Sequence, residues 1–161
     1  MPILSLAFED SGNMHEDLVL RLDAFDRRCD SYYLALDPGI FPDREDAEKV
    51  TLVLTRLLRR WLSDVESMAP GDTTYLPYEF DDQCSGWLQV TAAEDGNLDV
   101  LPVWSVLEGW AFIPSAYASG QQAVGRTEPV WANLQPQRMS REEALACISA
   151  AIAVAEGQTR T

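Results

Sequence analysis

The single histidine of this chain limits the catalysis that its residue types can support. Nucleophilic catalysis by serine or cysteine needs a base beside the nucleophile, and His15 stands in a polar segment near the amino terminus. No serine lies in a Gly-x-Ser-x-Gly pattern. The cysteines Cys29, Cys84 and Cys147 are far apart and form no Cys-x-x-Cys pair, which argues against a zinc site or a disulfide scaffold. We therefore predict no enzyme activity and no catalytic residue.

Carboxylates are plentiful, and they suggest two other kinds of chemistry. Glu79, Asp81 and Asp82 are close enough in sequence to offer oxygen ligands to a hard cation, but they lack the Asp-x-Asp-x-Asp-Gly frame of a calcium loop. Glu79 and Glu108, each near a tryptophan, could supply the paired carboxylates of a glycosidase-like site. Nothing in the sequence sets the distance between these two groups, so we assign no metal and no cofactor.

The distribution of charge is the strongest signal in the sequence. The chain has 26 acidic and 12 basic residues, which gives a formal net charge of −14. No lysine or arginine falls between Trp61 and Gly125, so this interval cannot neutralise itself. Its ten acids are Asp64, Glu66, Asp72, Glu79, Asp81, Asp82, Glu94, Asp95, Asp99 and Glu108. Nucleic acid and anionic membranes are therefore poor partners, because both need clustered cations, whereas a basic protein would be attracted.

Three tryptophans in the same interval suggest how a partner could bind. Trp87, Trp104 and Trp110 cannot all be buried on one face of a small sheet without crowding it, which favours at least one at a surface or in a groove. The alternative is that all three pack in the core or in a smaller cluster beside it. Aromatic anchors surrounded by acids are typical of a protein interface for a basic partner. The predicted partner-binding residues are Glu79, Asp81, Asp82, Trp87, Glu94, Asp95, Asp99, Trp104, Glu108 and Trp110.

A sheet must hold these side chains, and residues 75–117 read as its central antiparallel meander. Residues 94–97, Glu-Asp-Gly-Asn, predict a hairpin turn in which glycine takes a positive φ angle. Pro77 cannot donate to a strand ladder, so its strand should lie at an edge or contain a bulge. The predicted strands cover residues 2–9, 31–36, 73–80, 87–93, 98–106 and 110–113, with 129–134 as a further possible edge strand.

Two long segments have the period of an amphipathic helix. In residues 43–68 apolar side chains recur every three or four positions, and Asp43 can cap the start. In the second segment Ser140 and Glu143 match a capping box, and Gly157 should end the helix. The expected buried stripe of this second helix is Leu145, Ile148, Ile152 and Ala155, with Ala144 and Ala151 beside it.

Residues 15–29 are ambiguous between a helix and a strand. Apolar residues at 18, 22, 25 and 29 have helical spacing, whereas leucines at 18, 20 and 22 alternate as in a strand. We favour a helix because acids lie near the start of this segment and arginines near its end. The elements together predict a single α+β domain over residues 1–161, with an antiparallel sheet of five or six strands packed against two or three helices.

Arg56, Arg59 and Arg60 gather on one flank of the first long helix. We interpret them as a solvated flank or as ion-pair partners for the acidic meander. Cysteine usage favours a reducing compartment, and residues 1–8 lack the basic region of a signal peptide. The sequence therefore predicts a cytoplasmic location.

The chain resembles the small acidic immunity proteins of bacterial polymorphic-toxin systems. The likeness rests on its size, on the acidic meander around Phe80-Asp81-Asp82-Gln83 and Gly86-Trp87, and on Glu108-Gly109-Trp110. This resemblance implies a cytoplasmic protein without catalysis that blocks a basic toxin by covering its active site. The alternative is a small-molecule or carbohydrate-binding protein, or a hydrolase, that uses tryptophan and glutamate side chains of the central sheet. Either protein would be a monomer or a homodimer.

Overall fold

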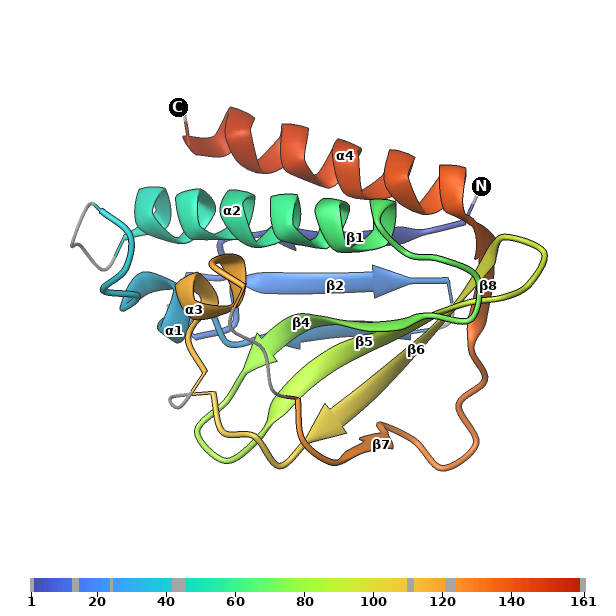
Figure 1. Ribbon diagram of the computed structural model, residues 1–161. Helices are drawn as coiled ribbons and strands as arrows, with labels where there is room; N and C mark the ends of the chain where they lie inside the picture. Colours follow the sequence, from blue (N-terminus) through green and yellow to red (C-terminus); the bar gives the residue numbers. More distant parts are fainter. Residues whose placement is uncertain are drawn as a thin grey trace.

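Two antiparallel sheets and four helices form the part of the chain that the computed structural model describes, namely residues 2–12, 15–23, 25–41, 46–109, 112–120 and 124–159. The predicted α+β class is confirmed. Figure 1 shows the two long helices lying side by side above the strands, with the two short helices together at one end. Within these ranges no helix combines the length and the apolar character needed to cross a membrane.

The first sheet holds three strands in chain order, β1 (Leu4–Phe8), β2 (Leu18–Leu22) and β3 (Phe25–Cys29). The helix predicted for residues 15–29 is therefore wrong. The apolar residues whose spacing matched a helix are cross-strand partners in the β2–β3 hairpin. Leu18 pairs with Cys29, and Leu22 pairs with Phe25. Positions placed symmetrically about a tight turn can reproduce the spacing of a helix face.

The second sheet is the predicted meander, formed by β4 (Thr73–Phe80), β5 (Ser85–Ala92) and β6 (Asn97–Ser105). Its ladder shifts register at Pro77, as the missing N–H of proline predicts, and Gly96 turns the hairpin with φ +85°. Two short strands complete the sheet. They are β7 (Thr127–Pro129), on the carboxyl end of β6, and β8 (Gln137–Ser140), on its amino end. The possible edge strand at residues 129–134 is not observed, and the sheet instead contains β7 before these residues and β8 after them.

The long helices α2 (Ala47–Glu66) and α4 (Arg141–Thr159) match the two amphipathic segments. Asp46 caps α2 by accepting the N–H of Lys49 at 3.0 Å, whereas Asp43 lies outside the described residues. The capping box of α4 is confirmed, because Ser140 N donates to Glu143 Oε2 at 2.8 Å and Glu143 N donates to Ser140 Oγ at 3.0 Å.

The far end of α4 differs from the prediction. The helix continues through Gly157, because Gln158 donates to Phe8 O at 2.9 Å and Thr159 donates to Thr51 Oγ1 at 2.9 Å, which anchors the last turn. The buried face of α4 also differs from the predicted one, because it contains more of the small side chains. Ala144, Ile148, Ala151 and Ala155 are buried, while Leu145 and Ile152 are half-buried.

The short helices α1 (Tyr32–Ala35) and α3 (Pro114–Ala118) were not foreseen. A strand was expected at residues 31–36, but these residues form a turn of helix that buries Leu34 against the core. A strand was also expected at residues 110–113. Trp110 lies outside the described residues, and Ile113 is the N-cap of α3, where Pro114 supplies a φ angle suited to the first helical turn. Both short helices pack against α2.

Candidate functional site

Glu79, which was expected on a docking face, is buried in the junction between the two sheets. It is 8% exposed and accepts two hydrogen bonds from the Arg27 guanidinium, at 2.7 Å from Nε and 2.9 Å from Nη2. Arg27 belongs to β3, so a strand of the first sheet neutralises a carboxylate of the second. The hydrogen bonds that Arg27 donates to Glu79 raise the pKa of Arg27 above its usual value. Glu79 is thus a structural residue and is not accessible to a partner.

The two acids near the β5–β6 turn are also compensated. Arg138 of β8 donates to Asp95 at 2.6 Å and to Asp99 at 3.2 Å. The pKa of Asp95 is lowered, first by the hydrogen bond from the Asn97 backbone N–H and then by Arg138. Glu94 in the same turn is exposed and has no ion pair among the described residues. Arg138 thus compensates one of the three negative charges at this end of the meander.

The opposite end of the meander keeps its negative charge. Asp81, Asp82 and Glu108 have no ion-pair partner in the ranges that the structure covers. Asp82 accepts a hydrogen bond from the Tyr33 hydroxyl, which raises the pKa of Tyr33 to about 12. Gly109 N donates to Asp81 O at 2.6 Å and brings Glu108 beside the β4–β5 turn.

Gly109 is required for this contact between the two loops. A Cβ atom at residue 109 would lie 2.5 Å from the backbone nitrogen of Asp81 and 2.6 Å from its oxygen, and neither of these backbone atoms could move aside easily. The contact between residue 109 and the β4–β5 turn therefore requires glycine. It places Glu108 at the same end of the sheet as Asp81 and Asp82.

The tryptophans divide between the core and the surface. Trp87 is 0% exposed, and its Nε1 donates to Ser85 Oγ at 2.7 Å, so it lies in the core. Trp104 is 37% exposed, which confirms that at least one indole of this interval reaches the surface. Trp87 pairs with Val103 and Gly86 pairs with Trp104, so the two indoles leave the sheet on opposite faces. Trp110 lies outside the described residues.

The ten predicted partner-binding residues therefore do not form one surface. The β5–β6 turn and the β4–β5 turn lie at opposite ends of β5, whose eight residues span roughly 25 Å. Figure 1 shows these turns at the right and at the lower left of the second sheet. We call the group at the second end the Trp104 surface. It consists of Asp81, Asp82, Trp104, Glu108 and Val106, which is 58% exposed and was not foreseen.

The glycosidase-like arrangement has no support in this geometry. Glu79 is occupied by Arg27, and neither Glu79 nor Glu108 lines the hollow of about 690 Å³ between α2 and α3. In the described part of the chain, no three His, Cys, Asp or Glu side chains gather closely enough to hold a metal ion. His15 Nδ1 lies 3.6 Å from Asp30 Oδ1, and the His15 ring is tilted against the Tyr32 ring with 5.4 Å between their centres.

The cysteines are free thiols, and none of them forms a disulfide within the described ranges. Cys29 is 1% exposed, as expected for a core residue, and burial raises the pKa of its thiol above the usual value. Cys147 is half-buried, and its Sγ donates to Pro2 O at 3.6 Å. Burial likewise raises the pKa of the Cys84 thiol. A raised pKa disfavours the thiolate, so the Cys29 and Cys84 thiols are poor nucleophiles.

The helix arginines do not pair with the central sheet. Arg60 donates to Asp64 on its own helix at 2.8 Å, and Arg59 pairs with Glu156 of α4. Arg56 has no ion pair with any residue that the structure describes. The cations that compensate the meander come instead from β3 and β8, and sequence reasoning missed both strands.

Comparison with known proteins adds no relative: the chain matches no protein-family model, no curated protein and no solved structure.

Proposed function

We propose that this protein is a cytoplasmic protein-binding module of the immunity or inhibitor kind, which docks a basic partner on the Trp104 surface. One observation supports this proposal above the others. Trp104 is exposed at the end of the sheet where three carboxylates lack ion-pair partners among the described residues. An exposed indole beside uncompensated acids combines an apolar anchor with electrostatic attraction.

The surroundings of Trp104 leave its ring accessible. Its cross-strand neighbours are Gly86 on β5 and Glu128 on β7. The Tyr78 ring fills the space beside Gly86, and Glu128 is engaged by Arg126 at 2.7 Å, which leaves Trp104 37% exposed. Val106 lies two residues further along the chain and adds exposed apolar area. Tryptophans in such settings often contribute more than 2 kcal/mol to a protein interface.

The overall charge supports the same kind of partner. A formal charge of −14 attracts a basic protein over distances of about one Debye length, roughly 8–10 Å at physiological salt. Arg138 reduces the negative charge of the hairpin end, whereas the three acids of the Trp104 surface have no ion-pair partner among the described residues. An inhibitor with this surface would act by covering a basic active site and would need no catalytic group of its own.

Binding to the product of a neighbouring gene tests the proposal. We expect that product to be a basic toxin whose affinity for this protein, measured by isothermal titration calorimetry, falls steeply between about 0.05 and 0.5 M NaCl as charges are screened. Replacing Trp104 by Ala should weaken binding at least tenfold, and Glu108→Lys should slow association.

Two matched variants separate this surface from other exposed groups. Trp131→Ala removes an indole that is 55% exposed and packs against Phe25, and Asp95→Lys changes an acid at the compensated end. Both variants should bind the partner nearly as well as the wild type. Equal losses for Trp104→Ala and Trp131→Ala, or an affinity indifferent to salt, would contradict the proposal.

A further inference from the structure

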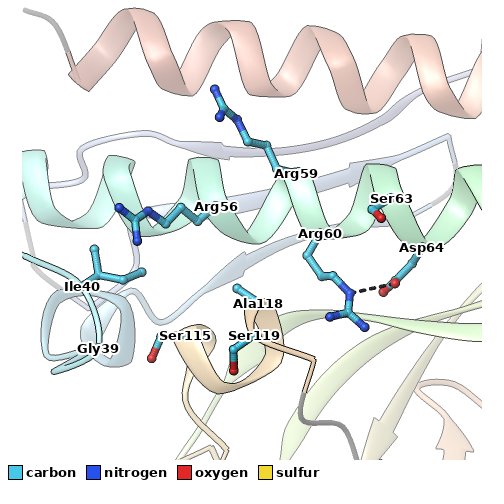
Figure 2. Close-up of a pocket in the computed structure, with 10 residues that line it drawn as sticks. All are labelled: Gly39, Ile40, Arg56, Arg59, Arg60, Ser63, Asp64, Ser115, Ala118 and Ser119. Atoms are coloured by element: carbon cyan, nitrogen blue, oxygen red, sulfur yellow. Dashed lines mark hydrogen bonds and ion pairs between the residues drawn. The ribbon is translucent and has the colours of Figure 1, made fainter.

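A hollow of about 690 Å³ opens between α2, α3 and the loop that joins α1 to α2 (Figure 2). Its volume lies within the roughly 300–1,000 Å³ usual for small-molecule sites. The hollow is lined by Gly39, Ile40, Arg56, Arg59, Arg60, Ser63, Asp64, Ser115, Ala118 and Ser119. Three arginines and one aspartate thus line it, which leaves a positive balance in a protein whose overall charge is strongly negative.

Arg60 is held in a fixed orientation at one side of the hollow. Its Nε donates to Asp64 Oδ1 at 2.8 Å, its Nη1 donates to Tyr117 O at 3.3 Å, and its guanidinium carbon lies 5.2 Å from the centre of the Tyr117 ring. These contacts use only two of the five N–H groups of the guanidinium. The other three N–H groups have no hydrogen-bond partner among the described residues. Arg60 is therefore held in place and can still donate hydrogen bonds to a ligand.

Arg56 lies one helical turn before Arg60 and borders the other side of the hollow, toward Ile40 (Figure 2). It is exposed and makes no ion pair in the ranges that the structure covers. Arg59, by contrast, turns toward α4, where it pairs with Glu156. Two cations therefore flank the hollow, and only the charge of Arg60 is compensated there, by Asp64.

The walls of the hollow are fixed by a buried polar network. Lys49 is 0% exposed, and its Nζ donates to Asp37 O at 2.7 Å and to Ile40 O, which ties the loop to α2. The Asp37 carboxylate accepts from Ser115 N and Ser115 Oγ, both at 2.6 Å, which ties the loop to α3. Gly39 packs directly against Ser115. Only glycine fits at this position, because a Cβ atom at residue 39 would lie 2.3 Å from Ser115 Oγ. A site whose walls are fixed in advance binds a ligand without an ordering cost.

We infer that this hollow binds a small molecule that carries more than one phosphate or carboxylate group, with one oxyanion held by Arg60 and a second held by Arg56 on the opposite side (Figure 2). Guanidinium groups suit such oxyanions because their planar N–H pairs match two oxygens at once. The volume leaves room for more than the anionic group, so the natural ligand is an anionic metabolite and not a lone inorganic ion. This site lies on α2, apart from the Trp104 surface of the second sheet.

Titration calorimetry with inorganic pyrophosphate and with citrate tests this inference, using sodium chloride at matched ionic strength as the reference. We expect saturable binding of at least one of the two anions. Tighter binding of pyrophosphate would identify the ligand as phosphate-bearing, and tighter binding of citrate would identify it as carboxylate-bearing. Absence of saturable binding for both at about 10 mM would overturn the inference.

Variants show whether binding occurs in this hollow. Arg56→Gln removes an exposed side chain without a described ion pair, so the fold should survive, and affinity should fall about tenfold through loss of a charge-assisted hydrogen bond. Arg126→Gln removes an equal charge outside the hollow and should bind like the wild type. If both variants lost affinity equally, the anions would be responding to net charge alone, and the site would be refuted. Trp104→Ala should bind the anion normally, which separates this test from that of the proposed partner.

Discussion

The Arg27–Glu79 pair offers the sharpest test of how the two sheets are held together. Arg27→Met would leave the Glu79 carboxylate without its partner in a place where its side chain is 10% exposed. Removing one member of a fully buried ion pair costs about 3–5 kcal/mol. Since some water reaches this site, we expect Arg27→Met to lower the free energy of unfolding by about 2–4 kcal/mol.

Glu79→Gln should be much milder. It leaves behind Arg27, whose side chain is 44% exposed and can be hydrated, and the glutamine oxygen can still accept a hydrogen bond. We expect a loss of about 0.5–1.5 kcal/mol. The double variant should be more stable than Arg27→Met alone, because no unpaired buried charge remains. Arg28→Met removes a neighbouring exposed arginine and serves as the control, with a loss of less than about 0.5 kcal/mol.

Urea denaturation followed by tryptophan fluorescence measures these differences. For a slope of about 2 kcal/mol per molar urea, Arg27→Met should move the midpoint down by about 1–2 M. Equal losses for Arg27→Met and Glu79→Gln, or a double variant no more stable than Arg27→Met, would refute the view that a stranded carboxylate dominates the cost. Such a result would mean that the arginine stabilises the junction through packing of its stem.

Three further outcomes can be measured. Gly39→Ala should lower the melting temperature, at a cost of about 1–3 kcal/mol, because the added methyl meets Ser115 Oγ at 2.3 Å. Cys29 should resist iodoacetamide in the folded protein and react only after unfolding, as mass spectrometry can show, because burial raises the pKa of its thiol. Asp95→Asn should lower the melting temperature at pH 7 but not near pH 2. The folded pKa of Asp95 is depressed, first by the Asn97 backbone N–H and then by Arg138, so the stability from these contacts is present at neutral pH and is lost as the pH falls through that pKa.

The local signals in the sequence were sufficient for the meander and the long helices. Gly96 and the capping box of Ser140 and Glu143 act within a few residues, so their geometry can be read without knowledge of the rest of the chain. The β2–β3 hairpin could not be read in this way. Its burial depends on neighbours on both sides, and its apolar pairs around the turn imitate helical spacing.

The candidate site depended on contacts that are distant in sequence. Arg27 and Glu79 are 52 residues apart, and Arg138 and Asp95 are 43 apart, so the absence of cations within the interval could not show which acids would be compensated. Trp87 and Trp104 both stand in strands of the meander. One is buried and the other exposed because different elements cover the two faces of the sheet, and only the tertiary structure reveals which.

The attachment of α4 to the first strand has a consequence for synthesis on the ribosome. Gln158 bonds to Phe8 across 150 residues, and Gln137 bonds to Ile3 across 134. The strand β1 therefore leaves the ribosome well before α4, which helps to cover its apolar side chains. Until then β1 and α2 expose surfaces that favour association with other nascent chains. We infer that the fold is completed only after translation has passed α4, so chains that stop short of that helix should be targets for chaperones and proteases.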